Sequence, residues 1–251
     1  MTESWLTWAM LLGAAFLGGG LNAVAGGGSF FTFPALVYAG VPPVAANATG
    51  TLSLLPGYMA STWGFREELR APAGLSMLAL VCTAGLGGAL GAGLLVLTPD
   101  ALFSVIVPWL LLAATLLFAL GPRLLRRLAA GDGEAGGPVQ ALTLFAVSVY
   151  GGYFNGGLGI VLLAAFGLLG HRDLNAMQGL KNLVSAVLTA IAVCLYAVGG
   201  SIVWLQGLVM MFTAVIGGYV VARLARHLPE AVVRAVVIVT GAVMTVLFFL
   251  Q

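Results

Sequence analysis

The sequence predicts an all-α polytopic membrane protein, organised as an inverted-topology repeat in which each half is a broken, V-shaped helix pair followed by three transmembrane helices. Hydrophobic residues make up 61% of the chain and charged residues only 7%, whereas an average globular domain is about 25% charged. Several apolar runs exceed the roughly 20 residues that a helix needs to cross a bilayer. A glycine-rich interruption occurs at a corresponding place in each half, which indicates an internal repeat.

The first half of the repeat covers residues 1–130. Its first apolar segment, residues 5–24, ends at Gly26-Gly27-Gly28, and a short apolar run over residues 29–38 follows. This run covers only ~15 Å as a helix, so we expect it to enter the bilayer partway or to tilt strongly. Three longer segments are expected to span the membrane: residues 44–63, 72–97 and 101–120.

The second half, residues 139–251, follows a linker over residues 131–138 that we predict to be cytoplasmic. Apolar residues 139–154 are interrupted by Asn155-Gly156-Gly157-Leu158-Gly159, and a short run over residues 160–169 comes next. Three segments are again expected to span the membrane: residues 174–198, 201–222 and 231–250.

A shift of 130 residues aligns the two halves, because it places Gly26-Gly27 on Gly156-Gly157 and Gly40 on Gly170. The order of a long, a broken, a short and three long segments is the same in both halves. The sequence therefore predicts two related halves rather than a single irregular bundle.

The arginines predict the orientation of the chain. The loops near residues 41–43, 98–100 and 199–200 hold no Lys or Arg, and the other loops are rich in Arg. The positive-inside rule places the Arg-rich loops in the cytoplasm and both termini in the periplasm. Each V then enters from an opposite side with its glycine break near the midplane. The arginines assigned to cytoplasmic loops are Arg66, Arg70, Arg123, Arg126, Arg127, Arg172, Arg223 and Arg226.

Lys181 is the only lysine in the chain. If Asp173 caps its helix, Lys181 lies ~12 Å along the helix axis, near mid-depth of a bilayer core about 30 Å thick. A charge at that depth costs roughly 3 kcal/mol or more. All eight acidic residues lie at segment ends or in loops, so none offers a counter-ion at this depth. We therefore interpret Lys181 as part of an intramembrane anion site; snorkelling and pairing with a backbone carbonyl are the structural alternatives.

The two glycine breaks add to this site. Non-helical backbone at membrane depth is tolerated where it is buried in protein or lines a cavity, and each short helix presents free N–H groups at its N-terminus. Such an end carries about half a positive charge and binds anions. Packing is the alternative role for these glycines. The predicted substrate-binding residues are Gly26, Gly27, Gly28, Ser29, Asn47, Thr51, Asn155, Gly156, Gly157, Gln178, Lys181 and Asn182.

The sequence lacks the signals of several other classes of protein. The glycines are not in the strand–loop–helix setting of a nucleotide fold, and His171 and His227 lie in loops without a metal-binding cluster. No catalytic set lies inside the membrane, so we predict no enzyme activity and no cofactor. Tyr58 is interpreted as an interfacial anchor or packing residue. The predicted partners are a small-molecule anion and the lipid bilayer, with no nucleic acid; the oligomeric state is not predicted.

Two motifs make the chain similar to a known family. The first is Ala25-Gly26-Gly27-Gly28-Ser29-Phe30, followed by Pro34-Ala35-Leu36 and Gly40-Val41-Pro42-Pro43. The second is Asn155-Gly156-Gly157-Leu158-Gly159, followed by Leu180-Lys181-Asn182-Leu183. In these motifs the chain resembles the sulfite exporter TauE/SafE-like family, also called toluene sulfonate uptake permeases. The resemblance implies transport of sulfur-containing anions, such as sulfite, thiosulfate or organosulfonates, across the bacterial inner membrane.

These observations predict a secondary transporter that works by alternating access, with the anion held at the midplane between two half-helix N-termini and Lys181. Two other classes stay open. An anion channel would share the charged centre but would conduct without saturation. A non-transporting subunit of a membrane assembly would use the glycine breaks for packing alone.

Overall fold

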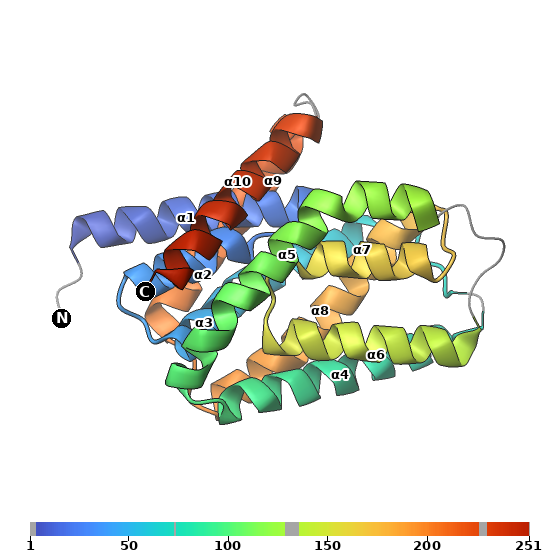
Figure 1. Cartoon of the computed structure of the whole chain (residues 1–251), viewed down its shortest axis with the longest axis horizontal. Helices are drawn as coiled ribbons and strands as arrows, with labels where there is room; N and C mark the ends of the chain where they lie inside the picture. The colour runs from blue at the N-terminus through green and yellow to red at the C-terminus, as the bar shows by residue number, and fades with distance from the viewer. Residues whose placement is uncertain (1–3, 73, 129–135, 226–229, 251) are drawn as a thin grey trace.

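A computed structural model of the chain describes residues 4–72, 74–128, 136–225 and 230–250. Within these residues it contains helices only, which confirms the all-α fold class (Figure 1). The first half holds α1 (Trp5–Ala25), α2 (Ser29–Tyr38), α3 (Pro43–Gly64), α4 (Met77–Leu97) and α5 (Asp100–Leu128). The second half holds α6 (Gly137–Tyr153), α7 (Leu158–Leu168), α8 (Leu174–Val198), α9 (Trp204–Ala225) and α10 (Glu230–Phe249).

The start of α4 differs from its prediction. The helix begins at Met77 rather than at residue 72, and Ser76 caps it by accepting a hydrogen bond from the Ala79 N–H at 3.2 Å. Pro72 and Gly74 precede this cap, and Gly74 has a φ of +82°. A left-handed glycine does not continue a helix, so the apolar run of the sequence is longer than the helix itself.

The arginine-rich ends also differ from their prediction. Arg123, Arg126 and Arg127 do not lie in a loop, because α5 continues through Leu128, and Arg223 lies within α9. Arginine is a good helix former, and a cation near a helix C-terminus is favourable. Both helices therefore continue beyond the end of the apolar run. The predicted linker over residues 131–138 ends earlier than expected, since α6 starts at Gly137. Residues 131–135, Arg226 and His227 fall outside the described residues.

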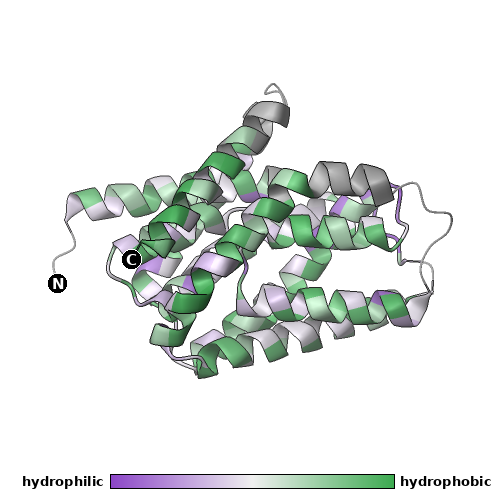
Figure 2. Ribbon diagram, viewed as in Figure 1, coloured by the Kyte–Doolittle hydropathy of each residue, from purple (hydrophilic) through white to green (hydrophobic). Residues whose placement is uncertain are grey.

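Five helices in the described residues are long and apolar enough to cross a membrane: α1, α4, α5, α8 and α9. Their outer faces carry large exposed apolar side chains, including Leu86 on α4, Trp109 on α5 and Phe212 on α9. Figure 2 shows that hydrophobic residues predominate along the helices. Lipid is the solvent that suits such a surface. The chain is therefore a multi-pass membrane protein. The predicted span α3 is long enough but more polar than these five.

The main helix pairs of the fold each join one helix of the first half to one helix of the second. The most extensive contacts are those of α1 with α9 and of α4 with α6, while α3 packs on α8 and α5 on α10. Matching α1–α5 in order with α6–α10 turns the α1–α9 pair into the α6–α4 pair. The same matching leaves the α3–α8 and α5–α10 pairs unchanged. The start of α1 and the end of α10 lie at the left of Figure 1, whereas α5 ends and α6 begins at the right. This arrangement agrees with a two-fold repeat, and the inverted relation between the halves stays a prediction.

Candidate functional site

The two glycine breaks, which are far apart in the sequence, contact each other directly in the fold. The Gly159 N–H donates a hydrogen bond of 3.4 Å to the Gly26 carbonyl oxygen. Gly26 has a φ of +77°, and a Cβ placed on it would lie 2.7 Å from the Gly159 Cα. Both the left-handed conformation and the backbone-to-backbone contact therefore require glycine at position 26.

A second hydrogen bond ties the breaks together in the opposite sense. The Ser29 hydroxyl donates to the Asn155 carbonyl oxygen at 3.2 Å, and both residues are buried. Ser29 and Gly159 are related by the shift of 130 residues. Each lies in the first turn of a short helix, and each donates a hydrogen bond to the break of the other half. The N-termini of α2 and α7 are thereby fixed side by side.

The backbone at both breaks keeps unused hydrogen-bond donors. Within the described backbone, no hydrogen bond is donated by the N–H groups of Gly27, Gly28 and Ser29, or by those of Gly156 and Gly157. The first N–H groups of any helix lack an intrahelical partner. Here two such ends meet inside the protein, so their partial positive charges add at one place.

Lys181 lies at this meeting point. Asp173 caps α8 as predicted, because its side chain accepts hydrogen bonds from the N–H groups of Asn175 at 2.9 Å and Ala176 at 3.3 Å. Lys181 is 1% exposed. A Cβ placed on Gly159 would lie 3.3 Å from the Lys181 Cδ, so the side chain runs along the start of α7. No hydrogen bond or ion pair to the Lys181 ammonium occurs within the described part of the chain.

Tyr58 also contacts this centre. Its burial contradicts the interpretation as an interfacial anchor, whereas its place in the buried core agrees with the packing interpretation. It is 1% exposed, and its hydroxyl donates to Asn155 Oδ1 at 3.0 Å. Asn155 Nδ2 is buried and has no hydrogen-bond partner in the described residues. A sequence signal for Tyr58 did exist, since it follows Thr51 by seven residues and Asn47 by eleven on α3. These spacings place all three on one helix face.

The other predicted side chains are close to this centre but have different partners. Asn47 donates from Nδ2 to the Tyr153 carbonyl oxygen at 3.1 Å, which places it at the end of α6. Thr51 donates to the Asn47 carbonyl oxygen of its own helix at 2.7 Å. Asn182 is buried beside Lys181, and Gln178 is half-buried one turn before it. Their contact with a ligand stays a prediction.

Two of the predicted glycines have packing partners. A Cβ on Gly28 would lie 2.9 Å from Leu54 Cδ2, and a Cβ on Gly27 would lie 3.2 Å from Phe30 Cδ2. Small residues at these points let neighbouring helices approach closely. Packing and ligand binding are compatible here, because the N–H groups of both glycines have no partner within the residues that the structure describes.

The electrostatic character of the site is positive. It combines two helix N-termini, the Lys181 ammonium and the Asn155 amide donor, and no carboxylate pairs with the lysine in the described residues. The same residues contain no cluster of His, Cys, Asp or Glu that could hold a metal ion. An arrangement of hydrogen-bond donors and positive charge inside a membrane is suited to an anion.

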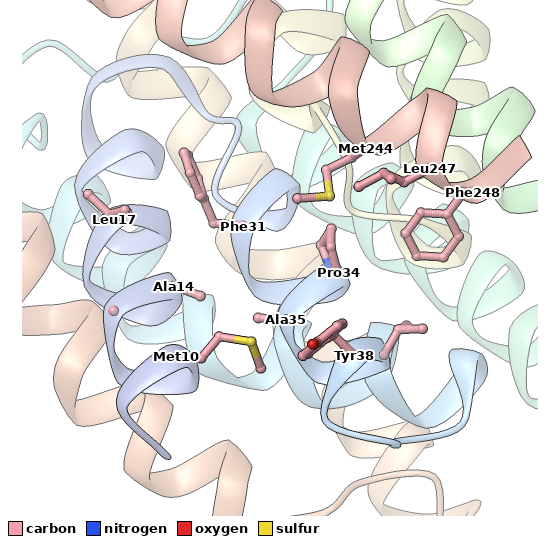
Figure 3. Close-up of a pocket in the computed structure, with 12 residues that line it drawn as sticks. Met10, Ala14, Leu17, Phe31, Pro34, Ala35, Tyr38, Met244, Leu247 and Phe248 are labelled. Atoms are coloured by element: carbon pink, nitrogen blue, oxygen red, sulfur yellow. The ribbon is translucent and has the colours of Figure 1, made fainter. Parts of the chain in front are cut away.

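An apolar groove lies elsewhere on the protein, between α1, α2 and α10. Figure 3 shows side chains from these three helices lining it, among them Met10, Phe31, Tyr38 and Phe248. Its volume is about 710 Å³, and no charged residue lines it. It has none of the charges of the centre formed by the two breaks, so we do not assign the anion to it.

Comparisons with known proteins agree with a transport role. The model of the sulfite exporter TauE/SafE family matches residues 11–248. A probable membrane transporter protein of Haemophilus influenzae is 29% identical over 244 residues, covering 94% of this chain and 92% of the relative. The probable membrane transporter protein ORF9 of Sinorhizobium sp. is 30% identical, covering 95% of this chain and 90% of the relative. The probable membrane transporter protein YfcA of Escherichia coli K12 is 28% identical, with coverages of 94% and 88%. No solved structure gives a significant match.

Proposed function

The chain belongs to the sulfite exporter TauE/SafE family and is a membrane transporter, and from this premise we propose that it moves sulfur-containing anions across the bacterial inner membrane. Sulfite, thiosulfate and organosulfonates are the proposed substrates. The anion would bind near the midplane, between the N-termini of α2 and α7 and beside Lys181. Transport would proceed by alternating access around this site.

One observation carries this proposal: the only lysine of the chain is 1% exposed against the contact between the two breaks and has no partner among the described residues. An unpaired charge at membrane depth costs roughly 3 kcal/mol or more. A bound anion removes that cost and also accepts hydrogen bonds from the free N–H groups of both half-helices. The identity of sulfur comes from the family, while the preference for an anion comes from the site.

The helix packing supports alternating access. The α1–α9 and α4–α6 pairs each join one helix from either half, so each forms a unit that mixes the two halves. The breaks and α3–α8 lie where such units meet. Transporters with repeats of this kind move one unit against another around a central site. A rocking motion at this position would expose the same anion to either side of the membrane.

The first experiment is anion binding to the purified protein by calorimetry, with sulfite, thiosulfate, sulfate and chloride. Wild type is compared with Lys181→Met, which keeps the length of the side chain without its charge, and with Lys181→Arg, which keeps the charge. Arg70→Gln is the control, because it removes a positive charge from an exposed site. We expect binding of at least one sulfur anion that is lost in Lys181→Met and retained in Arg70→Gln. Equal binding by Lys181→Met and wild type would refute the role of the lysine.

Uptake into proteoliposomes then separates a transporter from a channel. A transporter gives a rate that saturates with anion concentration, whereas a channel gives a rate that rises in proportion. Absence of binding for every anion would instead favour a packing role for the breaks.

A further inference from the structure

We propose that Tyr58 is a positioning residue for the anion site: its hydroxyl fixes the Asn155 amide so that the NH₂ group, and not the carbonyl oxygen, is presented to the ligand. This inference rests on the proposed function and deepens it, because it assigns the site a preference for oxyanions that carry no hydrogen-bond donor. Sulfate would then be preferred over hydrogen phosphate, although the two dianions have nearly the same size and shape.

The orientation of the Asn155 amide follows from its contacts. The Tyr58 hydroxyl donates to Asn155 Oδ1 at 3.0 Å, so the carbonyl end of the amide already has a partner. The Asn155 backbone carbonyl is held separately by Ser29 at 3.2 Å. With the backbone and the carbonyl end both fixed, the NH₂ group is the free end. It is buried and has no partner in the described residues.

The Tyr58 hydroxyl donates its hydrogen to Asn155 and not to its other polar side-chain neighbour. Asn22 is the second polar neighbour of this hydroxyl. Asn22 Oδ1 is buried and has no partner within the described chain, so Tyr58 donates to Asn155 and not to Asn22. A hydroxyl has one hydrogen to donate. Because this hydrogen is donated to Asn155 Oδ1, the NH₂ end of the amide is the end that the ligand meets.

A second feature supports the assignment of the free NH₂ group to the anion site. Asn155 lies in the break that contacts Gly26, and the Lys181 side chain runs along Gly159 of the same break. The unpaired Asn155 NH₂ group thus belongs to the second break, and the unpaired Lys181 ammonium belongs to a side chain that lies against the same break. A ligand that satisfied both would need acceptor oxygens in at least two directions, as an oxyanion has.

The expected selectivity follows from donor and acceptor counts. Sulfate and sulfite accept hydrogen bonds through every oxygen, whereas hydrogen phosphate in alkaline buffer carries one O–H that needs an acceptor. A site whose amide is locked as a donor leaves that O–H facing another donor. Mispaired buried polar groups weaken binding strongly, so we expect sulfate to bind at least about fivefold more tightly than hydrogen phosphate.

The test measures binding of sulfate and hydrogen phosphate to wild type, Tyr58→Phe, Asn155→Ala and the double variant. Tyr58→Phe keeps the ring and removes only the hydroxyl, so the amide is free to turn. We expect about a fivefold loss of sulfate affinity and a smaller preference over phosphate. The double variant should bind no more weakly than Asn155→Ala alone, because Tyr58 acts through Asn155. Additive losses, or an unchanged preference in Tyr58→Phe, would overturn the inference.

Tyr196→Phe is the matched control. Tyr196 is 1% exposed and donates to the Gly152 carbonyl oxygen, so its loss also removes one buried hydroxyl contact. We expect Tyr196→Phe to alter thermal stability but to leave the preference for sulfate over phosphate as in wild type. An equal loss of preference in this control would show a general structural effect and would also overturn the inference.

If Tyr58→Phe does not fold, binding to the wild-type protein still tests the inference. Equal affinities of the wild-type protein for sulfate and hydrogen phosphate would contradict an amide locked as a donor. If wild type binds no anion at all, the proposed function itself fails. Anion binding that depends on Lys181 but not on Tyr58 would refute only the positioning role.

Discussion

Gly26→Ala tests the contact between the two breaks, on which the candidate site depends. A Cβ at this position would lie 2.7 Å from the Gly159 Cα and 3.2 Å from the Gly159 nitrogen. Those are backbone atoms, which cannot rotate away as a side chain can. Overpacking of this kind typically costs about 1–3 kcal/mol. The φ of +77° at Gly26 adds about 1–2 kcal/mol for any residue with a Cβ. The total expected loss of stability is therefore about 2–5 kcal/mol.

Gly40→Ala separates the two contributions. Gly40 has a φ of +86°, but a Cβ on it would meet nothing within 4 Å. This variant should lose only the about 1–2 kcal/mol that comes from the left-handed conformation. Gly13→Ala serves as a second control, since Gly13 lies within α1 and also has no atom within 4 Å of its added Cβ. Alanine in a helix is favoured over glycine by about 1 kcal/mol, so this variant should be as stable as wild type or slightly more stable.

The assay is unfolding of each purified variant in detergent, together with anion uptake in proteoliposomes. We expect Gly26→Ala to be less stable than Gly40→Ala by the about 1–3 kcal/mol of the collision. We also expect Gly26→Ala to lose uptake, because α2 and α7 must move apart to admit the methyl group, whereas Gly40→Ala should retain it. Equal stability and equal uptake of the two variants would show that the breaks do not touch, and the geometry of the site would then be wrong.

The other predictions concern the cap of α8 and the orientation of the chain. Asp173→Ala removes the acceptor for the N–H groups of Asn175 and Ala176 and should cost about 1 kcal/mol in detergent unfolding; an unchanged unfolding midpoint would contradict the capping role. For orientation, Ser201→Cys lies between α8 and α9, and Glu67→Cys lies between α3 and α4. In a background without Cys82 and Cys194, a membrane-impermeant maleimide should label Ser201→Cys in intact cells and Glu67→Cys only after permeabilisation. The reverse pattern would invert the predicted topology.

Local sequence patterns predicted the parts of the fold that local forces determine. The bounds of α2 agree with the predicted short run, because Gly28 precedes it and Gly40, with a φ of +86°, follows it. The cap of α8 was also predictable, since Asp173 stands directly before an apolar run. Helix ends that carry arginine were not predictable from hydropathy. The backbone of α5 continues through them to Leu128 because arginine favours the helix even where it does not favour the membrane.

The centre of the site was predicted in composition but not in its contacts. Periodicity gives the face and the depth of a residue on its own helix, but it does not say which other segment lies opposite. The bond from Gly159 to Gly26 joins residues in different halves, so no local pattern contains it. Tyr58 was missed for the same reason. Tyrosine near a helix end is commonly an interfacial anchor in membranes, and only the position of Asn155 shows that its hydroxyl points inward.

The contacts of Lys181 disagree with both structural alternatives, which are snorkelling and pairing with a backbone carbonyl. Snorkelling requires the side chain to run toward the membrane surface, but the Lys181 Cδ lies beside Gly159 at the second break. Pairing with a carbonyl requires a hydrogen bond, and the ammonium makes none within the described residues. The second break, beside which this side chain lies, also holds donors without partners in the described residues, namely Asn155 Nδ2 and the N–H groups of Gly156 and Gly157. Donors cannot satisfy a cation. The proposed anion would satisfy these donors by accepting from all of them at once, and such a ligand would stabilise the protein by about 2.7 kcal/mol at a hundred times its Kd.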